Sequence, residues 1–320
     1  MSFSPLFLSM RQAAVQFSSE SGSGGGRKAL SDITLDIRQG EFVALVGPNG
    51  SGKSTLASVM LGLCPLSRGS LAMQENSKLR GVLQQPDTQV LGDTVEEEFA
   101  LTLRQLYDNA EQLAAVRQAA LLQVGLRLAP GTPFSSLSGG QRQLVNIALA
   151  LAARPDGLLL DEATAMLDPH TREHMLELVK AAHSQGATII WITHRMEEAA
   201  AAERIIALQA GELAFDGTPE AFFYSEPAGL LLSRSGEASS VCAGNDRPDA
   251  RSGISGRQTA SAVLQPAPCE RLALEPPYVV RTVKALRERG IAVEGCPLQA
   301  DQLAAALQAC HPLRREVSPL

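Results

Sequence analysis

The chain has 320 residues and a formal net charge of −6. This length allows one large domain and a smaller one. The negative charge disfavours a nucleic-acid partner, because surfaces that bind nucleic acid are basic. No apolar run approaches the roughly 18–20 residues that a membrane-spanning helix needs, and no signal peptide is expected, so any membrane role should depend on a partner protein. Five scattered cysteines without a CxxC pair indicate neither a zinc site nor a disulfide framework.

The N-terminal part predicts strands that lead into a glycine-rich loop. Residues 10–17 are expected to form an opening strand, and the Ser- and Gly-rich residues 18–26 a hairpin tip. Residues 30–37 alternate apolar and polar side chains, as a half-buried strand does. Residues 42–46 are continuously apolar, which is typical of a central parallel strand.

Helical and strand-like patterns alternate along the rest of the first two thirds of the chain. Helices are expected at 95–124 (broken near 108–109), 141–153 and 171–184, and short buried strands at 158–160 and 188–192. This alternation predicts an α/β fold with a mainly parallel sheet.

The composition changes after about residue 233. Residues 236–269 are rich in Ser, Gly, Ala, Pro and Arg and are expected to be a flexible linker. Helical patterns return at 278–289 and 303–307. We therefore expect a main domain over 1–235 and a small C-terminal domain over 270–320.

A phosphate-binding loop is indicated by the sequence GPNGSGKS at 47–54, which fits G-x-x-x-x-G-K-[ST] between a predicted strand and a predicted helix. Glycines let backbone N–H groups turn toward phosphate oxygens, and the helix presents its N-terminus to the same anion. Lys53 is expected to reach the β- and γ-phosphates, and Ser54 to bind Mg²⁺. The candidate ATP-binding residues are Gly47, Pro48, Asn49, Gly50, Ser51, Gly52, Lys53, Ser54 and Thr55.

Two acids and a histidine follow predicted buried strands. Asp161 is expected to bind Mg²⁺, and Glu162 to polarise the attacking water. His194 is expected near the γ-phosphate or that water. Alone, acids at a strand end favour ordinary turn chemistry, and a histidine there is usually a polar loop residue. The upstream phosphate loop favours the catalytic interpretation of all three residues.

The sequence LSGGQ at 137–141 resembles the signature of ABC ATPases. It precedes a predicted helix and so forms a second N-terminal anion site. The resemblance covers about 10–223 and implies that two ATP-binding subunits associate head to tail. It implies that Ser138, Gly139, Gly140 and Gln141 cover the ATP held by the other subunit.

The same resemblance assigns further roles. It implies that Glu162 is the catalytic base and that His194 is the switch histidine. It implies that Gln84 contacts Mg²⁺ and senses a transmembrane partner, and that Asp168, in the loop 165–168, lies across the dimer. It also implies an α-helical subdomain at about 94–149 and an antiparallel β edge.

A narrower resemblance is to the ATPase subunits of energy-coupling factor (ECF) importers. It rests on QQPDTQ at 84–89, THRMEE at 193–198 and a C-terminal extension at 277–307, which that family uses for contact between ATPase subunits. ECF importers take up vitamins or transition-metal ions such as cobalt and nickel. The resemblance implies a second ATPase subunit, identical or paralogous, and a transmembrane coupling protein with a substrate-binding membrane component. It implies a peripheral location on the cytoplasmic face of the membrane.

Two positions depart from the ABC pattern. The family often places a tyrosine two residues after Phe17 to stack on adenine, where this chain has Ser19. Either Phe17 takes that role or the stack is lost and ATP binds more weakly. The proline that usually follows the catalytic glutamate is Ala163, which should be harmless.

Other features favour structural interpretations. His170 and His174 share a predicted helix face without an evident third metal ligand, and Trp191 is expected in the core. The acidic run 96–98 is expected to be a solvated helix start, with a partner contact as the alternative. The rival functions are an ATPase of another ABC transporter class, a soluble ABC protein without a membrane partner, and a degenerate ATPase.

Overall fold

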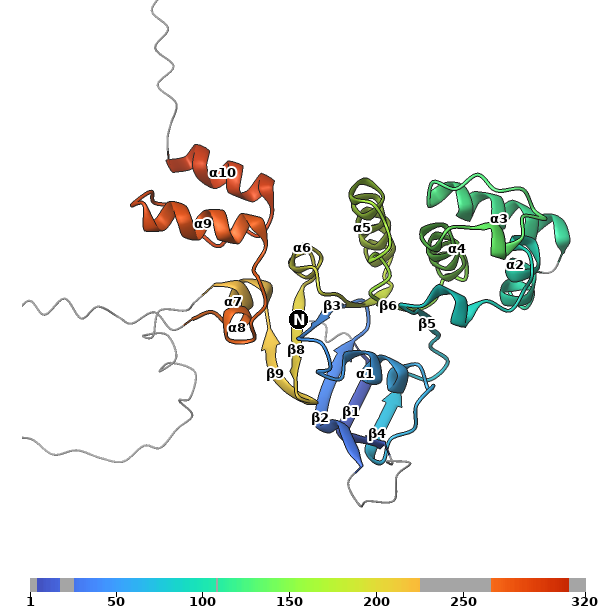
Figure 1. Ribbon diagram of the computed structural model, residues 1–320, viewed down its shortest axis with the longest axis horizontal. Helices are drawn as coiled ribbons and strands as arrows, with labels where there is room; N and C mark the ends of the chain where they lie inside the picture. Colours follow the sequence, from blue (N-terminus) through green and yellow to red (C-terminus); the bar gives the residue numbers. More distant parts are fainter. Residues whose placement is uncertain (1–4, 18–25, 108, 225–265, 311–320) are drawn as a thin grey trace, which may run out of the picture.

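The computed structural model describes residues 5–17, 26–107, 109–224 and 266–310 (Figure 1). Most of the predicted hairpin tip at 18–26 and of the predicted linker at 236–269 therefore lies outside the described residues. Within them, no helix combines the length and apolar character required to cross a membrane.

A six-stranded sheet forms the centre of the main domain, in the order β5-β6-β7-β3-β8-β9. The first five strands in this order run parallel, and β9 pairs with β8 antiparallel. The strands are β3 (Phe42–Val46), β5 (Leu79–Val82), β6 (Gly157–Asp161), β7 (Thr188–Ile192), β8 (Arg204–Gln209) and β9 (Glu212–Gly217). Every residue of β3, β6 and β7 is buried, so the predicted central strands and the α/β fold are confirmed.

A second, antiparallel sheet has the order β2-β1-β4 and is made of β1 (Leu6–Phe17), β2 (Arg27–Arg38) and β4 (Arg68–Met73). Both β1 and β2 extend beyond the predicted ranges. Their inward side chains, such as Met10 and Ile33, share one apolar core with α1 (Lys53–Met60) and with Val43 and Leu45 of β3. This sheet is the expected antiparallel edge.

The other face of the central sheet packs against helices. Trp191 of β7 is 1% exposed and stacks on Phe42 with ring centroids 6.1 Å apart, so its predicted core position is confirmed. The helices around this core include α5 (Pro169–Ser184) and α6 (Met196–Ala199).

The helical subdomain contains α2 (Val95–Leu103), α3 (Ala110–Gln123) and α4 (Gly139–Ala152), and the predicted break near 108–109 is confirmed. A short 3₁₀ helix at Pro86–Gln89 precedes it, and a second at Phe134–Ser136 lies between α3 and α4. Thr94 and Glu97 form a capping box at the start of α2, the arrangement that satisfies free N–H groups there.

The prediction that the acidic run 96–98 is solvated is wrong for Glu98. Its side chain is buried and accepts hydrogen bonds from the backbone N–H groups of Leu91 and Gly92, each at 2.7 Å. Both N–H groups precede α2, and the carboxylate gives the buried N–H of Gly92 the partner that it would otherwise lack. Glu98 therefore anchors the segment before α2.

The C-terminal helices lie on the opposite side of the molecule from the helical subdomain (Figure 1). They are α8 (Pro268–Arg271), α9 (Tyr278–Glu288) and α10 (Ala300–Cys310); α8 packs against α7 (Pro219–Phe223), and α10 against α9. α8 begins inside the range expected to be linker. Val280 and Val283 of α9 are fully buried, and the Tyr224 hydroxyl donates a 2.6 Å hydrogen bond to the carbonyl of Pro297. The C-terminal segment is thus attached to the main domain.

The hydrogen bond of Tyr224 gives a stability prediction. Tyr224→Phe should lower the free energy of unfolding by about 1–2 kcal/mol, because the buried Pro297 carbonyl loses its partner. Chemical denaturation measures the change. The matched control is Tyr278→Phe, since that side chain is 68% exposed and the substitution should have an effect below about 0.5 kcal/mol. Equal effects of the two substitutions would contradict the importance of the contact.

Candidate nucleotide-binding site

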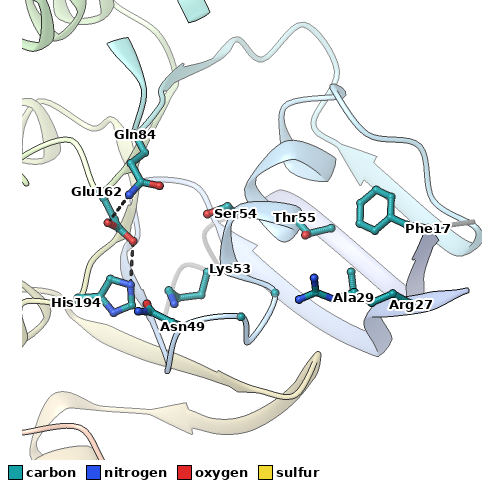
Figure 2. A pocket seen from close by; sticks show the side chains of 12 residues that line it. Phe17, Arg27, Ala29, Asn49, Lys53, Ser54, Thr55, Gln84, Glu162 and His194 are labelled. Atoms are coloured by element: carbon teal, nitrogen blue, oxygen red, sulfur yellow. Dashed lines mark hydrogen bonds and ion pairs between the residues drawn. The ribbon is translucent and has the colours of Figure 1, made fainter. Parts of the chain in front are cut away.

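A pocket of about 810 Å³ opens where β3, β6 and β7 end. It is lined by Phe17, Arg27, Ala29, Asn49, Gly50, Gly52, Lys53, Ser54, Thr55, Gln84, Glu162 and His194 (Figure 2). In parallel strands the carboxyl ends meet at one edge of the sheet, and this edge is where ligands bind in such folds. The predicted phosphate loop, acids and histidine are therefore brought together.

The phosphate loop needs its glycines for two reasons. Gly47, Gly50 and Gly52 have φ values of 146°, 75° and 104°, which side chains disfavour. A Cβ on Gly47 would also overlap the carbonyl oxygen of Leu208. The loop can consequently run close to β8 and still present its backbone N–H groups to the pocket.

Lys53 is the first residue of α1, and its side chain is only 5% exposed. Its Nζ donates to the carbonyls of Gly47 at 2.8 Å and Pro48 at 3.1 Å. Burial lowers the pKa of Lys53, and the nearby carboxylates of Glu162 and Asp161 oppose that shift. The cation is thereby placed inside the loop, at the N-terminus of α1, where an anion is favoured.

Asp161 ends β6 and is 4% exposed. Its Oδ1 is buried and has no hydrogen-bond partner within the described part of the chain. Burial raises the pKa of Asp161, and the Ser54 hydroxyl opposes the shift. An unsatisfied buried carboxylate oxygen close to a hydroxyl provides the oxygen ligands that Mg²⁺ prefers, so these residues fit that ion.

Glu162 lies between His194 and Gln84. One carboxylate oxygen is 2.9 Å from Nε2 of His194, and the other accepts a 3.0 Å hydrogen bond from the Gln84 amide (Figure 2). Glu162 has a φ of 49°, a left-handed conformation that costs a non-glycine residue about 1–3 kcal/mol. Such strain persists only where the surroundings enforce it. Here the Glu162 N–H donates to the carbonyl of Ile192, at 3.0 Å, and so joins β6 to β7 beyond the ladder.

Ser138 and Asp168 begin helices instead of lining the pocket. Ser138 Oγ accepts from the N–H of Gln141, whose side chain in turn accepts from Ser138 N–H, and this capping box starts α4. Asp168 accepts from the N–H and hydroxyl of Thr171 at the start of α5, and the hydroxyl contact lowers the pKa of Asp168. Gly139 and Gly140 lie beside Met166, and a Cβ on either would come within 3.2 Å of it. Within the described chain, residues 138–141 do not contribute to the pocket.

Arg27 lines the pocket but was not predicted as a site residue. It pairs with Phe17 across the β1–β2 ladder, which places both side chains at the mouth of the pocket (Figure 2). Phe17 is 48% exposed there, as a residue that stacks on a ligand must be. Only the hairpin register brings Arg27 to this place. A basic residue that opens the second strand was the available signal, and it is weak.

The loop that carries Gln84 is held by side chains to which the sequence motifs assign no role. Gln89 accepts from the N–H of Leu83 and donates to the carbonyl of Gly81, so the loop folds back on β5. Arg142 of α4 pairs with Asp87 at 2.6 Å. The loop is therefore tied to the helix that begins at the LSGGQ sequence.

Comparisons with known proteins agree with this geometry. The ABC transporter family matches residues 30–165. The energy-coupling factor transporter ATP-binding protein EcfA of Methanosarcina acetivorans is 40% identical over 207 residues, which are 61% of this chain and 76% of that protein. EcfA1 of Bacillus subtilis is 40% identical over 209 residues, covering 62% of this chain and 74% of that protein.

Solved structures give the same result. The dimeric ATP-binding cassette MJ0796 in a post-hydrolysis state, bound to ADP and Pi, has a TM-score of 0.61 and 28% identity, covering 66% of this chain and 98% of its own. The structure of cbiO1 from Clostridium perfringens, part of the ABC transporter complex cbiONQ, has a TM-score of 0.56 and 26% identity, with coverages of 68% and 90%. This chain therefore belongs to the family of energy-coupling factor transporter ATP-binding proteins, and it is an ABC-type ATP hydrolase.

Proposed function

We propose that the chain binds and hydrolyses ATP in the pocket of Figure 2 and thereby energises an ECF-type importer for a vitamin or a transition-metal ion. The observation that carries the catalytic part is Glu162, held between His194 and Gln84 at the edge of the phosphate loop. The identity of about 40% to ECF ATP-binding proteins supports the transporter class.

The phosphate loop holds the triphosphate. Its N–H groups and the start of α1 face the β-phosphate, and Lys53 exchanges its carbonyl partners for the more strongly accepting β- and γ-phosphate oxygens. Asp161, Ser54 and Gln84 would hold Mg²⁺, which would neutralise negative charge on the triphosphate. Phe17 stacks on adenine, and Arg27 faces the ligand from the neighbouring strand.

Glu162 is the general base. When ATP binds, His194 interacts with the γ-phosphate and Gln84 would hold Mg²⁺, which leaves the carboxylate of Glu162 free to accept a hydrogen bond from the attacking water. Glu162 orients that water for in-line attack, while Lys53 and His194 stabilise the charge that develops on the γ-phosphate.

A second ATPase subunit, identical or paralogous, completes each site. The position of Ser138, Gly139, Gly140 and Gln141 outside the pocket of their own chain supports a role on ATP held by the partner. Asp168 lies in the same interface. The dimeric form of MJ0796 supports this pairing.

The remaining assembly follows from the ECF assignment. A transmembrane coupling protein with a substrate-binding membrane component holds the two ATPase subunits at the cytoplasmic face of the membrane, and cbiO1, as part of the complex cbiONQ, supports such an assembly. We assign 1–235 to the ATPase domain and 270–320 to a small domain that takes part in contact between ATPase subunits.

Glu162→Gln tests the general base. The substitution keeps the size of the side chain but removes its basicity, so ATP turnover should fall by about 10²–10⁴-fold while an ATP-bound dimer still forms. Phosphate release and size-exclusion chromatography with ATP measure the two properties. The control is Glu173→Gln on the exposed side of α5, which should keep normal turnover. Normal turnover in the Glu162 variant would exclude the assignment.

Phe17→Ala tests the adenine contact. Loss of one stacking ring should weaken ATP binding by about 1–3 kcal/mol, roughly 5- to 150-fold in Kd, whereas Phe17→Tyr should bind normally. Equilibrium titration with a fluorescent ATP analogue measures both variants. Equal Kd values for alanine and tyrosine would show that the adenine does not stack on residue 17.

The transporter class is tested by isolating the tagged chain from detergent-solubilised native membranes, followed by mass spectrometry. Recovery of a coupling membrane protein together with a small substrate-binding membrane protein is the expected result, and the identity of the latter indicates the cargo. Recovery of a conventional permease pair, or of no membrane protein, would leave the ATPase assignment in place and remove the importer class.

A further inference from the structure

Glu198 is a buried acid that the proposed mechanism does not use. It lies in the short helix α6 and is 6% exposed. One of its carboxylate oxygens accepts from the hydroxyl of Thr164 at 2.6 Å, and the other from the hydroxyl of Thr193 at 2.5 Å. Both threonines are also buried, so the three side chains form a closed polar cluster.

The two threonines belong to the two loops that carry the reacting groups. Thr164 stands two positions after Glu162, in the segment that follows β6, and Thr193 immediately precedes His194 after β7. The Thr193 hydroxyl also accepts from the N–H of Arg195, so it fixes the backbone on both sides of His194. One carboxylate therefore joins the chain next to Glu162 to the chain next to His194.

The local backbone needs such a connection. Glu162 has a left-handed φ of 49°, and a residue in that conformation stays there only when several contacts enforce it. The Glu162 N–H donates to the carbonyl of Ile192, which fixes the backbone between β6 and Glu162. The bond from Thr164 to Glu198 holds the side that follows Glu162.

The charges around Glu198 favour an accepting carboxylate. Burial raises the pKa of Glu198, while the hydroxyls of Thr164 and Thr193 and the cations Arg195 and Arg172 lower it. Arg195 Nε is 3.6 Å from the carboxylate. Burial has the larger effect, so the pKa of Glu198 is raised, and the two hydroxyl donors and two nearby cations offset part of its loss of hydration.

We propose that Glu198 is a positioning residue for ATP hydrolysis, which acts through Thr164 and Thr193 to hold Glu162 and His194 in register. The inference rests on the roles proposed above for Glu162 and His194. It predicts that loss of the cluster slows the chemical step. ATP affinity should be unchanged, because none of the described hydrogen bonds joins this cluster to the phosphate loop that binds ATP.

The test removes the hydroxyls one at a time in the full-length chain. Thr164→Val and Thr193→Val keep the side-chain shape and should each lower kcat by about 10- to 100-fold, the effect expected when reacting groups are misplaced by about 1 Å. The KM for ATP and the Kd for an ATP analogue should stay within about 2-fold. Thr164→Ser and Thr193→Ser restore the donor and should restore kcat. Glu198→Gln should resemble the valine variants, and Glu197→Gln, at the exposed neighbouring position, should have normal kcat.

Several outcomes would overturn the inference. Normal kcat in folded Thr164→Val and Thr193→Val would do so. Equal losses of kcat and ATP affinity, or a kcat that falls in proportion to the thermal midpoint of each variant, would also do so, because either result indicates that the cluster only stabilises the fold. Glu162→Gln is measured alongside. If that variant turns over normally, the proposed base is wrong; if only the cluster variants turn over normally, the role of Glu198 alone is wrong.

Discussion

The parallel ladder that joins β6, β7 and β3 determines where every group of the site lies. In this ladder Asp161 is in register with Ile192. Glu162 follows Asp161 by one position and His194 follows Ile192 by two, so the Glu162 carboxylate lies 2.9 Å from Nε2 of His194. β3 pairs with β7 on its other side and releases the phosphate loop at the same edge. The strands are buried on both faces, and a slip by one residue would exchange the side chains that pack in the two cores. The geometry of the site is therefore as rigid as the core.

The same burial makes the unliganded charges of the site unfavourable. Desolvation lowers the pKa of Lys53 and raises that of Asp161, so each is shifted toward its neutral form. Lys53 donates its hydrogen bonds to carbonyl oxygens, with the carboxylates of Glu162 and Asp161 nearby, and Asp161 Oδ1 has no partner among the described residues. In the proposed complex, a triphosphate with its cation would offer both groups stronger, charged partners in a region of low dielectric. The poorly compensated charges thus lower the stability of the unliganded fold, and binding of a nucleotide would stabilise the folded state.

The sequence predicts those parts of the fold in which a local pattern of residues is compatible with only one backbone structure. Glycines at positive φ, continuous apolar strands and helix-start patterns are of this kind, and they located the central sheet, α4 and the pocket. Long-range pairing was not predictable. Glu98 belongs to an acidic run whose pattern predicts solvent exposure, yet its side chain is buried in the structure. Arg27 lines the pocket only because of the β1–β2 register. Tyr224 donates its hydrogen bond to Pro297, which is distant in the sequence. These contacts depend on tertiary packing, which a local pattern does not contain.

The surface proposed to meet a second ATPase subunit is complete before any partner binds. Ser138 and Asp168 satisfy N–H groups at the first turns of α4 and α5 within their own chain, so both helix starts are fixed. Met166 lies against Gly139 and Gly140, where a Cβ on either glycine would make a tight 3.2 Å contact, and so the two segments form one surface. A surface with its backbone already ordered loses little conformational entropy on association. In the proposed dimer, free energy from ATP binding would then be available for closing the pair and moving the loop of Gln84, which Arg142 ties to α4 through Asp87.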